Sequence, residues 1–218
     1  SGDTLITSGG TLNHQSVTLP GRIVSDGGTI ATVANYNLNA TIGLQSDTTF
    51  NTPASSSTIS GVIEDEGGSP GAFIKTGSGT YSLTNTGNTF SAGLEIQQGG
   101  IVGSTTVSLG SGGVIAQNGT TITLRATATQ GAGVLLQPGA LAVLHDSADG
   151  ITALDGSSFR LFQDNRSTQN PVNISGVVTM LTPPQASQTL QNFQGVISGT
   201  GKLVYDGSAD TAQFTDLE

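Results

Sequence analysis

The sequence predicts an all-β protein and, within that class, a right-handed parallel β-helix, a solenoid in which short strands stack from one turn to the next. Three observations lead to this fold. The composition disfavours helices, short β-type runs recur roughly every 6 to 10 residues, and the runs end in residues that favour tight bends. No window of about 12 residues keeps the three-and-four spacing of apolar residues that a helix requires.

The composition favours pleated surfaces over helices. The chain has 218 residues with 32 glycines and no cysteine, and its serines and threonines together number 55. Serine and threonine compete with helices by hydrogen bonding to their own backbone, and the apolar residues are mostly the valine, isoleucine and leucine of β-structure. Without cysteine no disulfide can hold the chain together, so the strands must bury a core of their own.

The β-type runs are only three to five residues long. Glycine, asparagine, aspartate or serine follows each within a few residues, as after Thr29–Ala31, Val114–Ala116, Thr121–Leu124 and Leu141–Leu144. An antiparallel sandwich would join such runs through two-residue hairpin turns. The candidates for such turns are Asn118-Gly119 and Asp26-Gly27, then Asp149-Gly150, Asp155-Gly156 and Asp206-Gly207.

The close spacing of the runs favours the parallel β-helix over the sandwich. Its turns of about 20 to 25 residues hold about three short strands each, with glycine and asparagine at the corners. At roughly 22 residues a turn the chain would make about ten turns. At about 4.8 Å per turn these would build a rod of roughly 48 Å.

The stretch GAFIKTGSGTYSLT, residues 71–84, shows how one turn is expected to be built. Alternation along its second run places Tyr81 and Leu83 on the inner face. Gly77 and Gly79 are expected at a corner where stacked turns leave no room for a side chain. Lys75, as a charged residue, is expected on the outer surface.

This stretch and its continuation resemble the autotransporter-associated β-strand repeat of bacterial type V secreted passenger domains. The matching positions in the first part are Phe73, Lys75, Gly77, Gly79, Thr80, Tyr81 and Leu83. Those in the second part are Asn88, Thr89, Phe90, Gly93, Ile96, Gly99 and Ile101. The resemblance covers residues 59–124, with an echo at 195–206 that lacks the second half of the repeat, and Ala92 stands where the family commonly has glycine.

The resemblance implies a function as well as a fold. It implies that residues 1–216 are a passenger fragment at the surface of, or released from, a Gram-negative bacterium. The expected role is a structural or adhesive segment that mediates cell adhesion or aggregation, with a host-cell surface, a glycan or protein receptor, or self-association as the partner. A toxin or protease passenger is an alternative, in which this fragment would be the stalk. Leu217-Glu218 resembles the remnant of a vector-encoded tag.

Charge and hydropathy narrow the range of partners. The net charge is −9, and the six lysines and arginines are scattered, so we expect no nucleic-acid partner. No apolar run approaches the length of a membrane helix, and we expect no direct membrane insertion by this fragment.

A carbohydrate-active enzyme, a polysaccharide lyase or hydrolase, is the second alternative. Its acid and base groups would come from the densest group of ionisable residues, which are His145, Asp146, Asp149, Asp155, Arg160, Asp164 and Arg166. Paired carboxylates on one outer face can protonate a leaving oxygen or abstract a ring proton. Because Asp149-Gly150 and Asp155-Gly156 are also ordinary turn dipeptides, we favour a structural role and expect no enzyme.

We expect neither a cofactor nor a metal site. Glu64-Asp65-Glu66 is a dense acidic run, yet it lacks the spacing of a calcium loop and is interpreted as solvated. His14 has no acid nearby except Asp3 and is expected in a surface loop. Loops that protrude are the expected contact surfaces of a rigid rod. The candidates are residues 51–58, 64–71 and 163–171 with 182–188, and the proline-containing stretches 51–57 and 181–187 are the main reason for choosing them.

Overall fold

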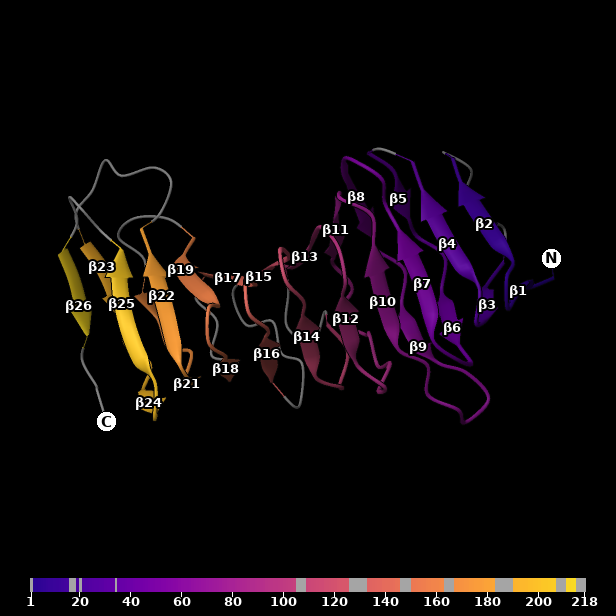
Figure 1. The fold of residues 1–218 in the computed structure, drawn as a ribbon. Helices are drawn as coiled ribbons and strands as arrows, with labels where there is room; N and C mark the ends of the chain where they lie inside the picture. Colours follow the sequence, from indigo (N-terminus) through magenta and orange to yellow (C-terminus); the bar gives the residue numbers. More distant parts are fainter. Residues whose placement is uncertain are drawn as a thin grey trace.

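The computed structural model describes residues 2–15, 19, 21–33, 35–104, 109–125, 133–145, 150–162, 167–182, 190–206 and 211–214. These residues form 26 strands and no helix. Every pairing between the strands is parallel. The strands stack along one long axis, with the two ends of the chain at opposite ends of the stack (Figure 1).

Two large sheets run along the stack. The ten-stranded sheet contains β2 (Thr11–His14), β4 (Thr29–Thr32), β7 (Thr48–Asn51), β10 (Phe73–Thr76), β12 (Leu94–Ile96), β14 (Val114–Ala116), β16 (Val134–Leu136), β18 (Ile151–Ala153), β21 (Val172–Ile174) and β24 (Ile197–Gly199). The nine-stranded sheet contains β5 (Asn37–Leu38), β8 (Ser56–Ile59), β11 (Thr80–Leu83), β13 (Gly100–Gly103), β15 (Thr121–Arg125), β17 (Leu141–His145), β19 (Ser158–Leu161), β22 (Val177–Leu181) and β25 (Lys202–Asp206).

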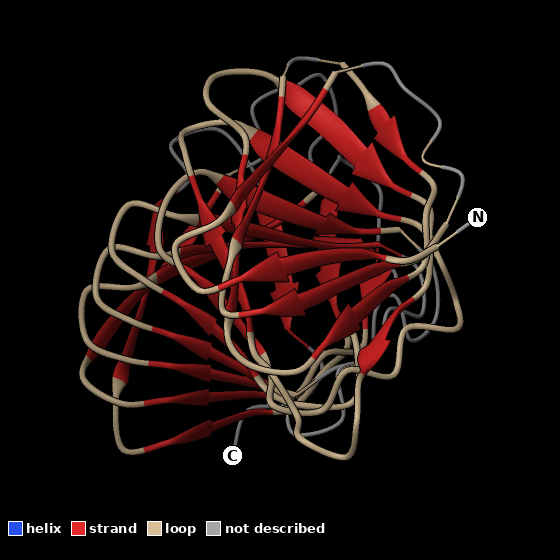
Figure 2. Cartoon of the chain, turned by 90° about the vertical axis from the view of Figure 1, so that its right-hand side faces the viewer, coloured by secondary structure: helices blue, strands red, loops and turns tan. Residues whose placement is uncertain are grey.

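A shorter sheet lies at each end of the stack. Near the N-terminus it contains β1 (Thr4–Thr7), β3 (Ile23–Asp26), β6 (Ile42–Leu44) and β9 (Ile63–Asp65). Near the C-terminus it contains β20 (Ser167–Thr168), β23 (Leu190–Phe193) and β26 (Thr211–Phe214). Viewed at 90° to Figure 1, the strands of successive turns lie behind one another (Figure 2).

The register between strands shows that the turns differ in length. Along the ten-stranded sheet, Val134 pairs with Ile151 in a short turn, whereas Val172 pairs with Ile197 in a longer one. The predicted class, an all-β parallel β-helix, is confirmed by this stacking. Its right-handedness and its ten turns stay predictions.

The corners are built as the glycine pattern indicates. Asn118-Gly119 joins β14 to β15 and Asp155-Gly156 joins β18 to β19, so each dipeptide connects two different sheets. Gly119, Gly139 and Gly156 have φ of 73°, 78° and 76° and stack through backbone hydrogen bonds of 3.1 and 3.0 Å. The hairpins that a sandwich would require do not form at these dipeptides.

The interior is lined by side chains that alternate with outward ones along each strand. In β10 and β11 the inward positions are Phe73, Lys75, Tyr81 and Leu83, and all four are fully buried. In β14 to β17 the inward positions are aliphatic, namely Val114, Ala116, Ile122, Leu124, Val134, Leu136, Ala142 and Leu144. The stack therefore has a single continuous core.

The proline-containing stretch 51–57 protrudes less than expected. Asn51 ends β7 and β8 begins at Ser56, which leaves residues 52–55 outside the strands. Thr52 is buried, its N–H donates to Thr76 O at 3.3 Å, and its carbonyl accepts from Gly79 N at 3.0 Å. The prediction of a loop over the whole stretch is wrong. The backbone before Pro53 is hydrogen bonded to the next turn, and the backbone from Ser56 onward belongs to β8.

Candidate functional site

The residues that carry the family resemblance occupy the interior and the corners of the stack. Phe73, Tyr81, Leu83, Phe90 and Ile96 are fully buried. Thr80 opens β11 and is half-buried. The side chain of Asn88 is buried, and its Oδ1 accepts a hydrogen bond from Ile63 N at 2.9 Å, which ties the loop after β11 to the turn before it. The described positions of the motif thus serve the fold.

Lys75 does not lie on the outer surface as expected. It is 0% exposed, because Phe73 and Lys75 share the inward face of β10. Its Nζ donates to the carbonyl oxygens of Thr76, Gly77 and Gln98 at 2.6, 2.7 and 3.2 Å. It also lies 5.7 Å from the centre of the Tyr81 ring. The sequence prediction judged Lys75 by its charge, whereas strand alternation decided its place.

Burial also determines the protonation of Lys75. Removal from water disfavours the ammonium and lowers the pKa of Lys75 to about 8. Only the ammonium has three hydrogens to offer the three carbonyl oxygens. At neutral pH the charged form therefore satisfies this corner, and above a pH of about 8 one carbonyl loses its donor.

Tyr81 extends the same internal network. Its hydroxyl donates to Asn51 O at 3.0 Å and lies 2.8 Å from Thr32 Oγ1. Because a phenol has one hydrogen, Thr32 is the donor in the second contact. Burial raises the pKa of Tyr81 to about 12, against the opposing effect of the hydrogen bonds from Thr32. The network links three turns, since its members lie in or at the ends of β4, β7 and β11.

Glycines make the close approach of the turns possible. A Cβ on Gly77, Gly79 or Gly99 would lie 2.2 to 2.3 Å from a backbone oxygen of the turn before it, and Gly77 and Gly99 have φ of +75° and +70°. Gly93 has φ of +101°, and its Cβ would lie 2.8 Å from Gly113 O. The expected corner role of Gly77 and Gly79 is confirmed.

His14 is not in a surface loop. It ends β2, is 4% exposed, and its ring meets Tyr36 edge-on at a centroid distance of 6.4 Å. Alternation along β2 turns His14 inward, as it does Lys75 in β10. The prediction for His14 is therefore wrong for the same physical reason.

The acidic run 64–66 is engaged by side chains rather than simply solvated. Arg22 forms ion pairs with Glu64, at 2.6 Å, and with Glu66. Asp65 accepts hydrogen bonds from the N–H and hydroxyl of Ser91 at 3.1 and 2.6 Å. Beyond the run, residues 67–70 form an exposed turn with Gly67 and Gly68 at positive φ.

The expected acid and base residues are only partly described. Asp146, Asp149, Asp164 and Arg166 lie outside the described residues, as do 163–166 and 183–188 of the candidate loops. Asp155 caps a turn, because its Oδ1 accepts from Val177 N at 2.7 Å. His145 and Arg160 lie on β17 and β19 of the nine-stranded sheet. The structure therefore shows a structural role for Asp155.

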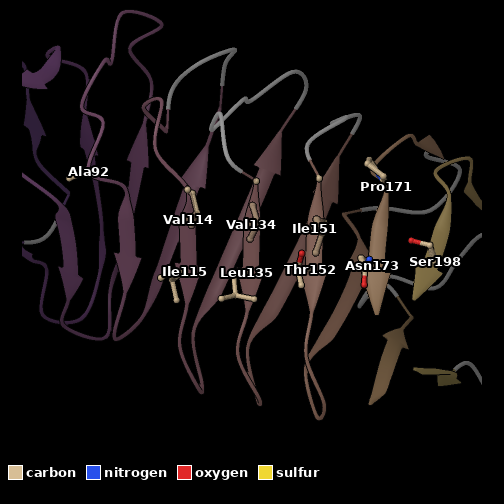
Figure 3. A pocket seen from close by; sticks show the side chains of 13 residues that line it. Ala92, Val114, Ile115, Val134, Leu135, Ile151, Thr152, Pro171, Asn173 and Ser198 are labelled. Carbon is tan, nitrogen blue, oxygen red and sulfur yellow. The ribbon is translucent and has the colours of Figure 1, made fainter. Parts of the chain in front are cut away.

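A groove that was not predicted lies on the outer face of the ten-stranded sheet. It has a volume of about 600 Å³ and crosses β14, β16, β18, β21 and β24 (Figure 3). Its floor is the row of outward side chains of Ile115, Leu135, Thr152, Asn173 and Ser198, which face one another rung by rung. Ile115 is 37% exposed. The floor is therefore apolar at one end and offers hydroxyl and amide groups at the other.

Three glycines are among the residues that line the groove. Gly113, Gly133 and Gly150 directly precede β14, β16 and β18, and their carbonyl oxygens accept hydrogen bonds from the preceding rungs at 2.9 Å. A Cβ on Gly150 would meet nothing within 4 Å, and its φ lies outside the left-handed region. A side chain at residue 150 would thus enter the groove without a clash.

The lining of the groove suits the binding of a ligand. A shallow trough of mixed polarity can hold an extended ligand by apolar contact and hydrogen bonds. Its sequence signal is the recurrence of a glycine before a β-branched residue, in Gly113-Val114, Gly133-Val134 and Gly150-Ile151. Only the stacking register shows that these dipeptides, and the outward residues after them, lie side by side.

Comparisons with protein-family models, with curated proteins and with solved structures found no match. Within the described part of the chain, no group of three or more acidic or histidine side chains is placed to hold a metal ion. The same residues contain no helix that is long and apolar enough to cross a membrane.

Proposed function

We propose that this chain is a structural and adhesive segment of an autotransporter-like passenger, exposed on or secreted from a Gram-negative bacterium. The observation that carries the proposal is the continuous parallel stack. The resemblance residues contribute to its core, and its outer faces are left for contact. Backbone ladders within two long sheets make such a stack stiff, as suits a spacer that presents binding faces.

The groove over β14 to β24 is the contact surface we assign to adhesion. It lies on a stiff sheet, and its floor combines apolar side chains with hydroxyl and amide groups. This mixture suits a glycan or protein receptor on a host cell. A second copy of the chain is the other partner consistent with a role in aggregation.

Attachment of coated beads to cultured epithelial cells tests this function. Beads that carry the folded chain should attach to cells, or clump with one another, more than beads that carry heat-unfolded chain. Ile115→Lys places a charge on the groove floor and should reduce the effect at least about fivefold. Val102→Lys, on the outer face of β13 in the other sheet, is the matched control and should leave it unchanged.

Two results would contradict the proposal. Equal attachment by folded and unfolded chain would remove the adhesive role, and equal loss in both lysine variants would remove the groove from it. Depolymerisation of a polysaccharide that is lost in Asp146→Asn or Asp164→Asn would instead establish the carbohydrate-active enzyme.

A further inference from the structure

A second surface feature lies on the nine-stranded sheet, on the outer face of β15, β17 and β19. The register aligns Thr123, Val143 and Arg160 in one row. The adjacent row begins with the pair Arg125 and His145. Phe162 continues that row, because its N–H donates to Leu144 O at 2.8 Å directly after β19. We name these six residues the outer array.

The centre of the outer array is shielded from water although it faces outward. Val143 is 3% exposed and Thr123 is 8% exposed. Among the described buried apolar residues, Val143 alone is absent from the interior core cluster. The centre of the array is therefore a small desolvated patch of its own, separate from the core of the stack.

The aromatic ring of the array contacts the side chains of Arg125 and His145. The guanidinium carbon of Arg125 lies 4.8 Å from the centre of the Phe162 ring. The ring of His145 meets Phe162 edge-on at 5.1 Å. Phe162 directly follows β19 and lies two residues after Arg160, so contact with its ring brings the head group of Arg125 toward the strand that carries Arg160.

The arginines of the array differ from Arg22 and Lys75, two other cations that the structure describes. Arg22 is paired with two glutamates, and Lys75 is enclosed by carbonyl oxygens. Within the described residues no carboxylate lies within ion-pair distance of Arg125 or Arg160. Arg160 is half-buried, and burial lowers its pKa because the charged form loses hydration. A partly desolvated guanidinium is stabilised by an anion.

We propose that Arg125 and Arg160, together with the Phe162 ring, form a binding site for an oxyanion group such as sulfate, phosphate or carboxylate. The planar fork of a guanidinium matches such a group with paired hydrogen bonds. The Phe162 ring holds the Arg125 head group in place through the cation–π contact. The site lies on the nine-stranded sheet and carries two arginines, whereas the groove lies on the ten-stranded sheet and is lined by apolar and uncharged polar residues.

Two ligands distinguish the sources of the anion. One arm titrates inorganic sulfate at constant ionic strength and follows the NMR signals of the arginine Nε–H groups. The other arm measures binding of a sulfated oligosaccharide, with its desulfated form as reference. Arg125→Gln and Arg160→Gln should each weaken binding about tenfold. Lys202→Gln, which removes an exposed charge from β25 in the same sheet, should change binding less than about twofold.

Each outcome of the two binding experiments either supports or contradicts the proposed oxyanion site. Binding of sulfate alone assigns a site for a free oxyanion, and binding of the sulfated oligosaccharide, with loss in the desulfated form, assigns an acidic glycan. Both results support the proposal. No response of Arg125 or Arg160 to either ligand would overturn it, and so would an equal loss in Lys202→Gln. Arg125 is exposed, so its variant tests the site even if Arg160→Gln fails to fold.

Discussion

Two regions of the stack fill their interiors differently. Around β10 the turn is long, since Thr48 pairs with Phe73, and the interior holds stacked aromatic rings with polar groups. The rings of Phe50 and Phe73 lie 3.8 Å apart and 4° from parallel. Between β14 and β16 the turn is shorter, since Val114 pairs with Val134, and the interior is aliphatic.

The difference shows how turn length and side-chain volume compensate for each other. Protein interiors keep nearly constant packing density, so a longer turn requires larger side chains or polar groups whose hydrogen bonds are satisfied. Lys75 and Tyr81 meet that requirement around β10 and β11, where the turn is longer. We call this part of the stack the wider region. Phe73, Lys75 and Tyr81 of the motif that resembles the passenger repeat thus fill the interior around β10 and β11.

The largest effect is expected where turns meet at glycine. Gly99→Ala should lower the free energy of unfolding by more than about 4 kcal/mol, because its Cβ would lie 2.2 Å from Gly79 O. Gly119→Ala, at a similar φ but with nothing within 4 Å of its Cβ, should cost about 1 to 2 kcal/mol. Urea unfolding followed by circular dichroism measures both. Equal losses of stability in the two variants would show that glycine is required at residue 99 only by its positive φ, and not by the close approach of the neighbouring turn.

The second largest effect is a pH dependence of the free energy of unfolding, which arises from Lys75 in the wider region. The pKa of Lys75 is lowered from 10.5 to about 8 by burial, so the unfolded chain binds more protons than the folded chain between these values. The free energy of unfolding should therefore rise with pH, relative to Lys75→Met, by about 2 kcal/mol between about pH 7 and pH 9.5.

This pH dependence has an internal check. The pKa of Tyr81 is raised to about 12, so its contribution is complete below pH 10 and is lost only as pH rises through 10 to 12. Denaturant melts kept below pH 10 thus isolate Lys75. Parallel curves for wild type and Lys75→Met across the range would disprove the shift.

A smaller effect is expected from the internal hydroxyl. Tyr81→Phe leaves Asn51 O and the Thr32 hydroxyl without this partner and should cost about 1 to 2 kcal/mol. Tyr36→Phe removes a hydroxyl from a half-buried residue and should cost less than about 0.5 kcal/mol. Thermal unfolding compares them. A larger loss of stability in Tyr36→Phe than in Tyr81→Phe would show that the hydrogen bonds of the Tyr81 hydroxyl do not stabilise the wider region.

The smallest effect on stability is expected in the aliphatic region. Gly150→Gln meets open space and should change the free energy of unfolding by less than about 0.5 kcal/mol. It should nevertheless reduce bead attachment, because the new side chain enters the groove. A stable variant with unchanged attachment would separate the groove from adhesion.

The sequence predicts the fold well because the fold depends on local signals. Short runs such as Val114–Ala116 form strands, and Gly77 and Gly79 lie at a corner as expected. Alternation correctly places Tyr81 and Leu83 inside. The same alternation, continued from Phe73, also places Lys75 inside, and the expectation of an outer position followed from its charge alone.

The surface features could not be read from the sequence because they depend on register. Ile115 and Thr152 share the groove floor only because two successive turns of unequal length bring both of them opposite Leu135. Arg125 and Phe162 are far apart in the sequence and meet through two successive pairings. No local pattern contains this information.

The central claim, that the resemblance motif builds the interior and leaves function to the outer faces, is tested most directly at Lys75. We would measure the pKa of its ammonium by NMR titration of the folded chain, with Lys75→Met to assign the signal. Burial of Lys75 should give a midpoint near 8. A midpoint near 10.5 would place Lys75 in water on the outer surface and contradict the account.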